Sequence, residues 1–123
     1  MEKVKILIVD DEQVVLDSCR KILEAEGYAV LFASSAVEAL AAMQTDEFSL
    51  LLIDVKMPEH DGMYLMRELN EHWPSTPVIV MSGYHTVQTI EEAKRMGAVS
   101  FIYKPFTPDE LIDSVRNAIH LLK

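Results

Sequence analysis

Residues 3–12 read KVKILIVDDE, a β-branched apolar run that ends in three consecutive acidic residues. A strand of this composition is typical of a parallel sheet covered on both faces. Three later apolar runs also lead into a polar residue: Leu50–Ile53 into Asp54, Val78–Met81 into Ser82, and Val99–Tyr103 into Lys104. In an open parallel sheet, ligands bind at the carboxyl ends of the strands. The sequence therefore predicts a site at that edge, built from Asp10, Asp11, Asp54, Ser82 and Lys104.

Strand and helix patterns alternate five times along the chain. The apolar runs predict strands at Lys3–Val9, Tyr28–Ala33, Leu50–Ile53, Val78–Met81 and Val99–Tyr103. Helical spacing and capping residues predict helices over 12–26, 35–45, 63–72 and 86–96, and a last one from Thr107. Such alternation requires right-handed crossovers. We therefore expect an α/β fold: a doubly wound five-stranded parallel sheet with helices on both faces.

Composition sets limits on function. With 123 residues, half of them hydrophobic, the chain 1–123 forms one domain with a sizeable core. A net charge of −9 argues against direct nucleic-acid binding, which needs a basic surface. The single cysteine, Cys19, excludes an internal disulfide and is expected to be a packed core thiol. Without a signal peptide or a membrane-length apolar run, the expected location is the cytoplasm, with no membrane contact.

The three aspartates favour a divalent cation. Two unit charges about 4 Å apart repel by roughly 4 kcal/mol at an effective dielectric constant of 20. Asp10, Asp11 and Asp54 therefore need neutralisation where they meet, and oxygen ligands in small number suit Mg²⁺. The alternative is that Asp11 caps the following helix while Asp10 is solvated.

Asp54 is the candidate for covalent chemistry. A carboxylate can act as a nucleophile and form an acyl phosphate beside a cation that screens the phosphoryl oxygens. Lys104 would supply a second positive charge, and Ser82 a hydroxyl hydrogen bond to the phosphoryl group. Taken singly, Lys104 is better explained as a surface lysine and Ser82 as a turn residue before Gly83. Their joint arrival at one sheet edge favours phosphoryl transfer.

Four motifs together resemble the receiver domain of two-component response regulators, in order and over essentially the whole chain. They are Val9-Asp10-Asp11-Glu12, Ile53-Asp54-Val55-Lys56-Met57-Pro58 with Gly62, Met81-Ser82-Gly83 and Tyr103-Lys104-Pro105-Phe106. The resemblance implies a flavodoxin-like strand order and a signalling switch that is phosphorylated by a partner histidine kinase or phosphotransfer protein. Such a domain catalyses its own phosphoryl acceptance and slow dephosphorylation, and is not a turnover enzyme.

The resemblance also assigns roles to residues. Asp54 would be the phosphoacceptor, Asp10 and Asp11 the Mg²⁺ acids, and the backbone carbonyl of Lys56 a further metal ligand. Ser82 and Lys104 would grip the phosphoryl group. The remaining roles fall on five positions: Tyr103 as the switch aromatic, Lys104-Pro105 as a cis junction, and the bulky Lys56 and Tyr84 as side chains that slow dephosphorylation.

Partner surfaces are predicted from helical spacing and from the same resemblance. Val15, Leu16 and Cys19 face the sheet, which leaves Val14 on the opposite side of its helix. With Ser18, Pro105 and Phe106, Val14 would dock the kinase. Phosphorylation would change the surface of the fourth helix and fifth strand. A homodimer through the fourth helix, fifth strand and fifth helix is a further expectation, although no residue pattern in the sequence indicates it.

These residues do not indicate which process the predicted switch controls. Residues 82–86 and 94–98 resemble receivers joined to ATPase-type transcription activators, which favours a role in transcription regulation. The domain 1–123 is either a complete small protein or the N-terminal module excised from a larger regulator.

Three alternatives stay open. One is a Mg²⁺-dependent phosphohydrolase with an aspartyl nucleophile, although such enzymes place a second acid where Lys56 stands. Another is a flavodoxin-like nucleotide-binding module, although Asp10-Asp11-Glu12-Gln13 offers no glycine-rich phosphate cradle. The third is a degenerate receiver that works as a binding surface alone.

Overall fold

The computed structural model describes residues 3–55, 61–83 and 87–120. Five parallel strands form one sheet in the order β2-β1-β3-β4-β5. The strands are β1 (Lys5–Val9), β2 (Ala29–Ala33), β3 (Leu50–Asp54), β4 (Val78–Ser82) and β5 (Ser100–Tyr103). The helices are α1 (Gln13–Ala25), α2 (Ala36–Thr45), α3 (Asp61–His72), α4 (Val87–Arg95) and α5 (Pro108–His120). The predicted doubly wound α/β fold and its flavodoxin-like strand order are confirmed.

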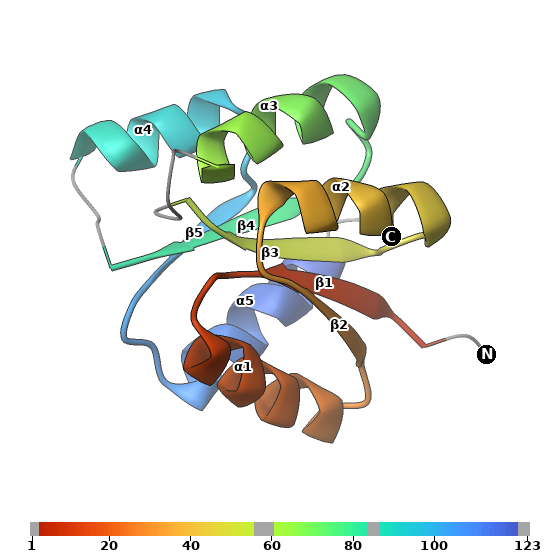
Figure 1. Ribbon diagram of the computed structural model, residues 1–123. Coiled ribbons are helices and arrows are strands. Elements are labelled where there is room, and N and C mark those ends of the chain that lie inside the picture. The colour runs from red at the N-terminus through yellow and green to blue at the C-terminus, as the bar shows by residue number, and fades with distance from the viewer. Residues whose placement is uncertain (1–2, 56–60, 84–86, 121–123) are drawn as a thin grey trace.

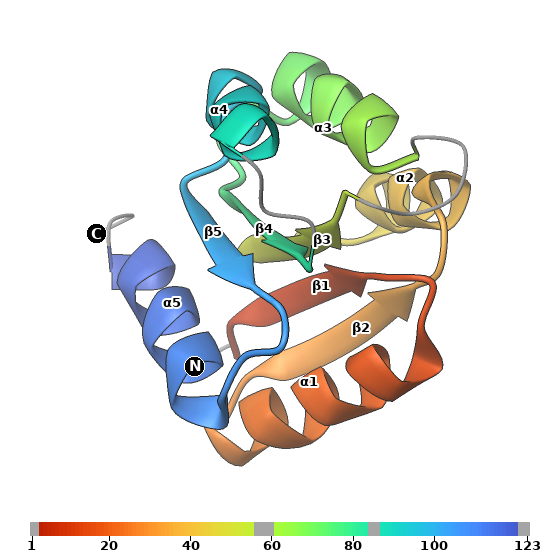
Figure 2. The same ribbon diagram turned by 90° about the vertical axis from the view of Figure 1, so that its left-hand side faces the viewer.

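The helices cover both faces of the sheet (Figures 1 and 2). Helices α2, α3 and α4 lie on one side, and α1 and α5 lie on the other. Within the described residues, no helix is both long and apolar enough to cross a membrane.

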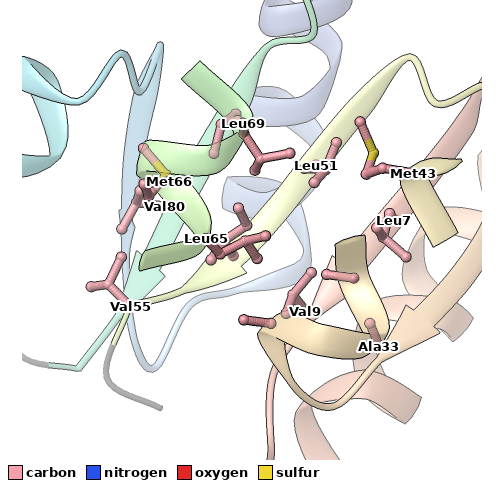
Figure 3. Close-up of a cluster of buried hydrophobic side chains, with 14 of the residues drawn as sticks. Leu7, Val9, Ala33, Met43, Leu51, Val55, Leu65, Met66, Leu69 and Val80 are labelled. Atoms are coloured by element: carbon pink, nitrogen blue, oxygen red, sulfur yellow. The ribbon is translucent and has the colours of Figure 1, made fainter. Parts of the chain in front are cut away.

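The two faces carry separate hydrophobic cores because side chains alternate along each strand. On β1, Leu7 and Val9 join the core under α2 and α3, which Figure 3 shows. Ile6 and Ile8 point the other way and pack against α1 and α5. The three central strands are buried on both faces, as their continuous apolar sequences predict.

Helix ends follow the predicted signals with one variation. Gly27 adopts φ 93° directly after the capping residue of α1, a left-handed conformation that costs glycine little. At α5, Thr107 and Glu110 exchange side-chain to backbone hydrogen bonds as a complete capping box. At α2, Ser35 accepts from the Glu38 amide, but the Glu38 carboxylate accepts from Ser34 instead of Ser35.

Several element boundaries differ from the predicted ones by one or two residues. The largest functional consequence is that Asp54 and Ser82 are the last residues of β3 and β4, not the residues after them. Asp54 pairs with Met81 and Ser82 with Tyr103 in the ladder. Both side chains are therefore held by regular strand backbone.

Candidate functional site

The carboxyl ends of the strands bring the predicted residues to one edge of the sheet. Asp10 directly follows β1, and its amide donates to the carbonyl of Ala33 at 3.1 Å, which continues the pairing with β2. Asp54 ends β3, and Lys104 directly follows β5. By strand alternation, Asp10 and Asp54 share the face of Ile8 and Leu52, the side covered by α1 and α5.

Lys104 links the two buried aspartates. Its Nζ lies 2.7 Å from Oδ2 of Asp10 and 3.0 Å from Oδ2 of Asp54, and donates a hydrogen bond to each. The side chain of Lys104 is 15% exposed, while those of Asp10 and Asp54 are 0% and 6% exposed. Such a protected charge-assisted pair is screened by water and salt less than one on the surface, although burying its charges also carries a desolvation penalty. The centre of the site is therefore a preorganised cluster of charges.

Burial and hydrogen bonding act in opposite directions on Asp10. Burial raises the pKa of its carboxyl above the usual value of 3.8 and outweighs the lowering by Lys104 and by the backbone bond from Glu12. That bond runs from the Glu12 amide to Oδ1 of Asp10 at 2.9 Å. The nearby Asp54 raises the pKa of Asp10 further. Asp10 therefore favours an additional cation when it is ionised.

The ammonium of Lys104 is held in its charged form. Burial by itself lowers its pKa, but the hydrogen bonds and charges of Asp10 and Asp54 outweigh burial and raise the pKa above 10.5. Lys104 therefore presents a positive charge beside Asp54 at neutral pH.

Within the described part of the chain, four carboxylates converge at this edge. Asp10, Asp11, Glu12 and Asp54 each offer one oxygen, and these oxygens all lie within 4.8 Å of one another. Asp10 and Asp54 are buried, whereas Asp11 and Glu12 are exposed. An all-oxygen donor set of this kind fits Mg²⁺, which binds through one or two carboxylates and keeps several waters. Asp10, Asp11 and Asp54 are thus suitably placed to hold it.

Glu12 is a member of the cluster that the sequence analysis did not assign. Its Oε1 lies 3.6 Å from Nζ of Lys104. The available signal was its position directly after the acidic pair, at the bend where the chain enters α1.

The other predicted site residues lie at the same edge with differing exposure. Ser82 is fully buried, and its backbone carbonyl accepts from the Lys104 amide at 2.9 Å, which joins the ends of β4 and β5. Tyr103 is half exposed, with its ring edge-on to Phe101 at a centroid distance of 5.4 Å. The predicted cis peptide is present between Lys104 and Pro105.

The predicted docking residues differ in accessibility. Val14 is 77% exposed, and Ser18 and Pro105 are also exposed. Phe106 is partly buried and packs against the core under α1 and α5. Lys56 and Tyr84, the residues predicted to slow dephosphorylation, lie outside the described residues, so the predicted metal contact of the Lys56 carbonyl does too.

A second group of possible ligands lies away from the strand ends. Glu68, Glu71 and His72 lie together on α3, with Glu71 and His72 exposed. This group fits a solvated helix surface with an i, i+4 contact of 3.9 Å between Glu68 and His72.

Comparison with known proteins assigns the family. The response regulator receiver domain profile matches residues 6–116. The chain is 36% identical over 107 residues to the alginate biosynthesis transcriptional regulatory protein AlgB of Pseudomonas aeruginosa, and 39% identical over 115 residues to the hydrogenase transcriptional regulatory protein HoxA of Cupriavidus necator. These alignments cover 87% and 93% of this chain and 24% of each relative. The chain thus spans about a quarter of the length of these relatives.

Solved structures agree with this assignment. A CheY-like receiver domain protein from Methanospirillum hungatei matches with a TM-score of 0.93 and 33% identity, covering 98% of this chain and 97% of that one. NtrX from Brucella abortus, in complex with ADP, matches with a TM-score of 0.92 and 34% identity over 98% of this chain and 28% of its own. The protein belongs to the family of response regulator receiver domains.

Proposed function

We propose that this domain is a phosphorylation-dependent signalling switch that accepts a phosphoryl group on Asp54 from a partner histidine kinase or phosphotransfer protein, with Mg²⁺ as cofactor. The observation that carries the proposal is the bridge from Lys104 to Asp54 and Asp10 at the strand ends. It supports the proposal because the candidate nucleophile Asp54, the ammonium of Lys104 and the candidate cation ligand Asp10 lie within one cluster. Family membership and the transcriptional relatives support the same function.

The transfer step follows from the charges of the site. An oxygen of Asp54 attacks the phosphorus of a phosphohistidine, and a new P–O bond forms as the P–N bond breaks. The electron pair of that bond stays on the imidazole nitrogen, which takes a proton from solvent. Mg²⁺, when bound, supplies charge that screens the phosphoryl oxygens from the carboxylates. Lys104 turns its ammonium to a phosphoryl oxygen, and the Ser82 hydroxyl donates to another.

The switch would pass from Ser82 to the surface of α4 and β5. The Lys104 amide bonds the Ser82 carbonyl, so a pull on either residue moves the adjoining ends of β4 and β5. Tyr103 follows at the same end, half exposed. Two arrangements of this segment, biased by a local charge, would form a bistable element. Hydrogen exchange across 83–103 should change on adding a phosphoryl mimic; identical exchange would exclude this switch.

Partner contacts belong to the same proposal. The exposed Val14, with Ser18 and Pro105, offers a small docking surface for the kinase. Val14→Glu should reduce transfer from the cognate kinase but leave acetyl phosphate labelling unchanged; intact transfer would argue against this surface.

A homodimer through α4, β5 and α5, and control of transcription by a longer protein, complete the proposal. We propose no direct nucleic-acid contact by this acidic domain.

Intact mass spectrometry tests the central step. The protein should gain one phosphoryl group, about 80 Da by the mass of PO₃H, on incubation with acetyl phosphate and Mg²⁺. Asp54→Asn and an EDTA control should each remove the adduct, because the proposal requires both nucleophile and cation. Absence of an adduct while Mg²⁺ measurably binds would point to acceptance from a kinase only or to a pure binding role.

A further inference from the structure

Among the described residues, three carboxylates lie near the ammonium of Lys104 and differ in distance and exposure. Asp10 and Asp54 are buried and hydrogen-bonded to Nζ at 2.7 and 3.0 Å. Glu12 lies 3.6 Å from Nζ, beyond a good hydrogen bond, and its side chain is 64% exposed. Glu12 is therefore close enough to receive the ammonium after a small rotation of the lysine side chain.

The backbone fixes the position of Glu12, while its carboxylate makes no hydrogen bond to the end of the helix. Its amide donates to Oδ1 of Asp10 at 2.9 Å. Glu12 is also the N-cap of α1, but its side chain makes no capping hydrogen bond. Glutamate is not among the preferred N-cap residues. The carboxylate approaches Lys104 instead of the helix end.

The proposed function creates a conflict that Glu12 would resolve. Asp10 and Asp54, which Lys104 holds through their Oδ2 atoms, are also members of the carboxylate cluster that could bind a divalent cation. A lysine ammonium and a divalent cation at such a separation repel each other. Lysine has a flexible four-carbon stem, so its charge can move while its backbone stays in place.

We propose that Glu12 is a positioning residue that receives the Lys104 ammonium when Mg²⁺ occupies Asp10 and Asp54. The inference rests on the proposed function because it presumes cation binding at this edge. Glu12 keeps the displaced ammonium at the site, from which it reaches an incoming phosphoryl oxygen. Its contribution to Mg²⁺ binding therefore depends on Lys104. A direct ligand role for Glu12, whose oxygen lies within 4.8 Å of those of the aspartates, would not depend on Lys104.

A double-mutant cycle separates the two roles. Mg²⁺ affinity is measured by calorimetry for the unchanged protein, Glu12→Gln, Lys104→Met and the double variant. Glutamine keeps the size of the side chain and the backbone bond to Asp10. Glu47→Gln is the matched control, since Glu47 is exposed in the loop before β3, at the opposite edge of the sheet.

We expect Glu12→Gln to weaken Mg²⁺ binding roughly tenfold, as is usual for residues that orient a metal site. Lys104→Met should tighten Mg²⁺ binding, because the competing charge is gone. In the Lys104→Met background, Glu12→Gln should have no more effect than Glu47→Gln. Equal weakening in both backgrounds would overturn the proposal in favour of direct ligation, and no weakening in either would overturn it outright.

A crystal structure with Mg²⁺ provides a second readout that does not depend on the stability of the Lys104 variant. The distance from Nζ of Lys104 to the Glu12 carboxylate should shorten to hydrogen-bond length while the contact with Asp10 is lost. An ammonium still on Asp10 would overturn the proposal. If the unchanged protein binds no Mg²⁺ and takes no phosphoryl group, the proposed function fails, and this inference fails with it. Binding and labelling without the coupling overturn this inference alone.

Discussion

Nζ of Lys104 lies 3.0 Å from Oδ2 of Asp54, although 50 residues separate them in the sequence. The distance follows from topology, because β3 and β5 end at the same edge with β4 between them. Asp54 and Lys104 are positioned by the sheet, whereas the exposed carboxylates of Asp11 and Glu12 come from the segment between β1 and α1.

Removal of the lysine charge should destabilise the domain. Lys104→Met leaves Asp10 and Asp54 buried without their shared ammonium, and losing one partner of a buried pair costs about 3 kcal/mol or more. Urea unfolding at neutral pH would measure the loss. Saturating Mg²⁺ should recover part of it by binding the folded form. An unchanged unfolding midpoint would mean that solvent already screens the pair.

Asp10→Asn should have the opposite effect on stability. The pKa of Asp10 is raised by burial, so its contribution to stability is full below the unfolded value of 3.8 and is lost as pH rises through the folded pKa. At neutral pH the charged form is therefore a net cost, which asparagine avoids. We expect a gain of about 1 kcal/mol in unfolding free energy, as is typical when an active-site charge is removed, with loss of Mg²⁺ binding. A loss of stability would show that the interaction between Lys104 and Asp10 stabilises the domain by more than burial of the Asp10 charge costs.

Gly62 occupies a position where no side chain fits. A Cβ there would fall onto the Cα of Val55 and lie 2.8 Å from its carbonyl oxygen. Because backbone atoms cannot rotate away, Gly62→Ala should destabilise the domain by about 2 kcal/mol and shift the start of α3 against the end of β3. Thermal unfolding measures the loss. Gly27→Ala is an informative comparison, since its Cβ would meet no atom within 4 Å and only the positive φ opposes it.

The sequence predicts the fold well because the buried parallel strands are continuous runs of apolar residues. It places Asp54 and Ser82 after their strands, since a polar residue at a strand end looks like loop when pairing is unknown. It starts α3 at Met63, two residues late, because Gly62 is a poor helix former. The close approach of Gly62 to Val55 is a tertiary contact that only the structure shows.

The candidate site, like the fold, could be predicted from the sequence only in part. Strand order alone brings Asp10, Asp54 and Lys104 together, so topology is sufficient to predict their meeting. Glu12 was missed because an exposed glutamate at a helix start is ordinary in sequence, and its relation to Lys104 depends on side-chain direction.

The thiol of Cys19 should impose an alkaline limit on stability. Cys19 is fully buried on α1, and burial, with a smaller effect of Asp10, raises its pKa from 9.0 to about 12. The folded form therefore holds the proton more tightly than the unfolded form, so stability is full below pH 9 and falls between pH 9 and 12. By pH 10.5 the loss should reach about 2 kcal/mol. Urea unfolding at pH 8 and pH 10.5 measures it.

Cys19→Ala isolates the thiol from other groups that titrate in the same range. Lys104 also loses charge at high pH, but it does so equally in both proteins. The variant should start less stable at pH 8, because a cavity replaces the sulfur, and then lose less on going to pH 10.5. Iodoacetamide labelling gives an independent check, since a buried protonated thiol reacts only when the domain opens. Parallel pH slopes for the two proteins, or rapid labelling of the native form at pH 8, would show that the thiol is not held protonated in the core.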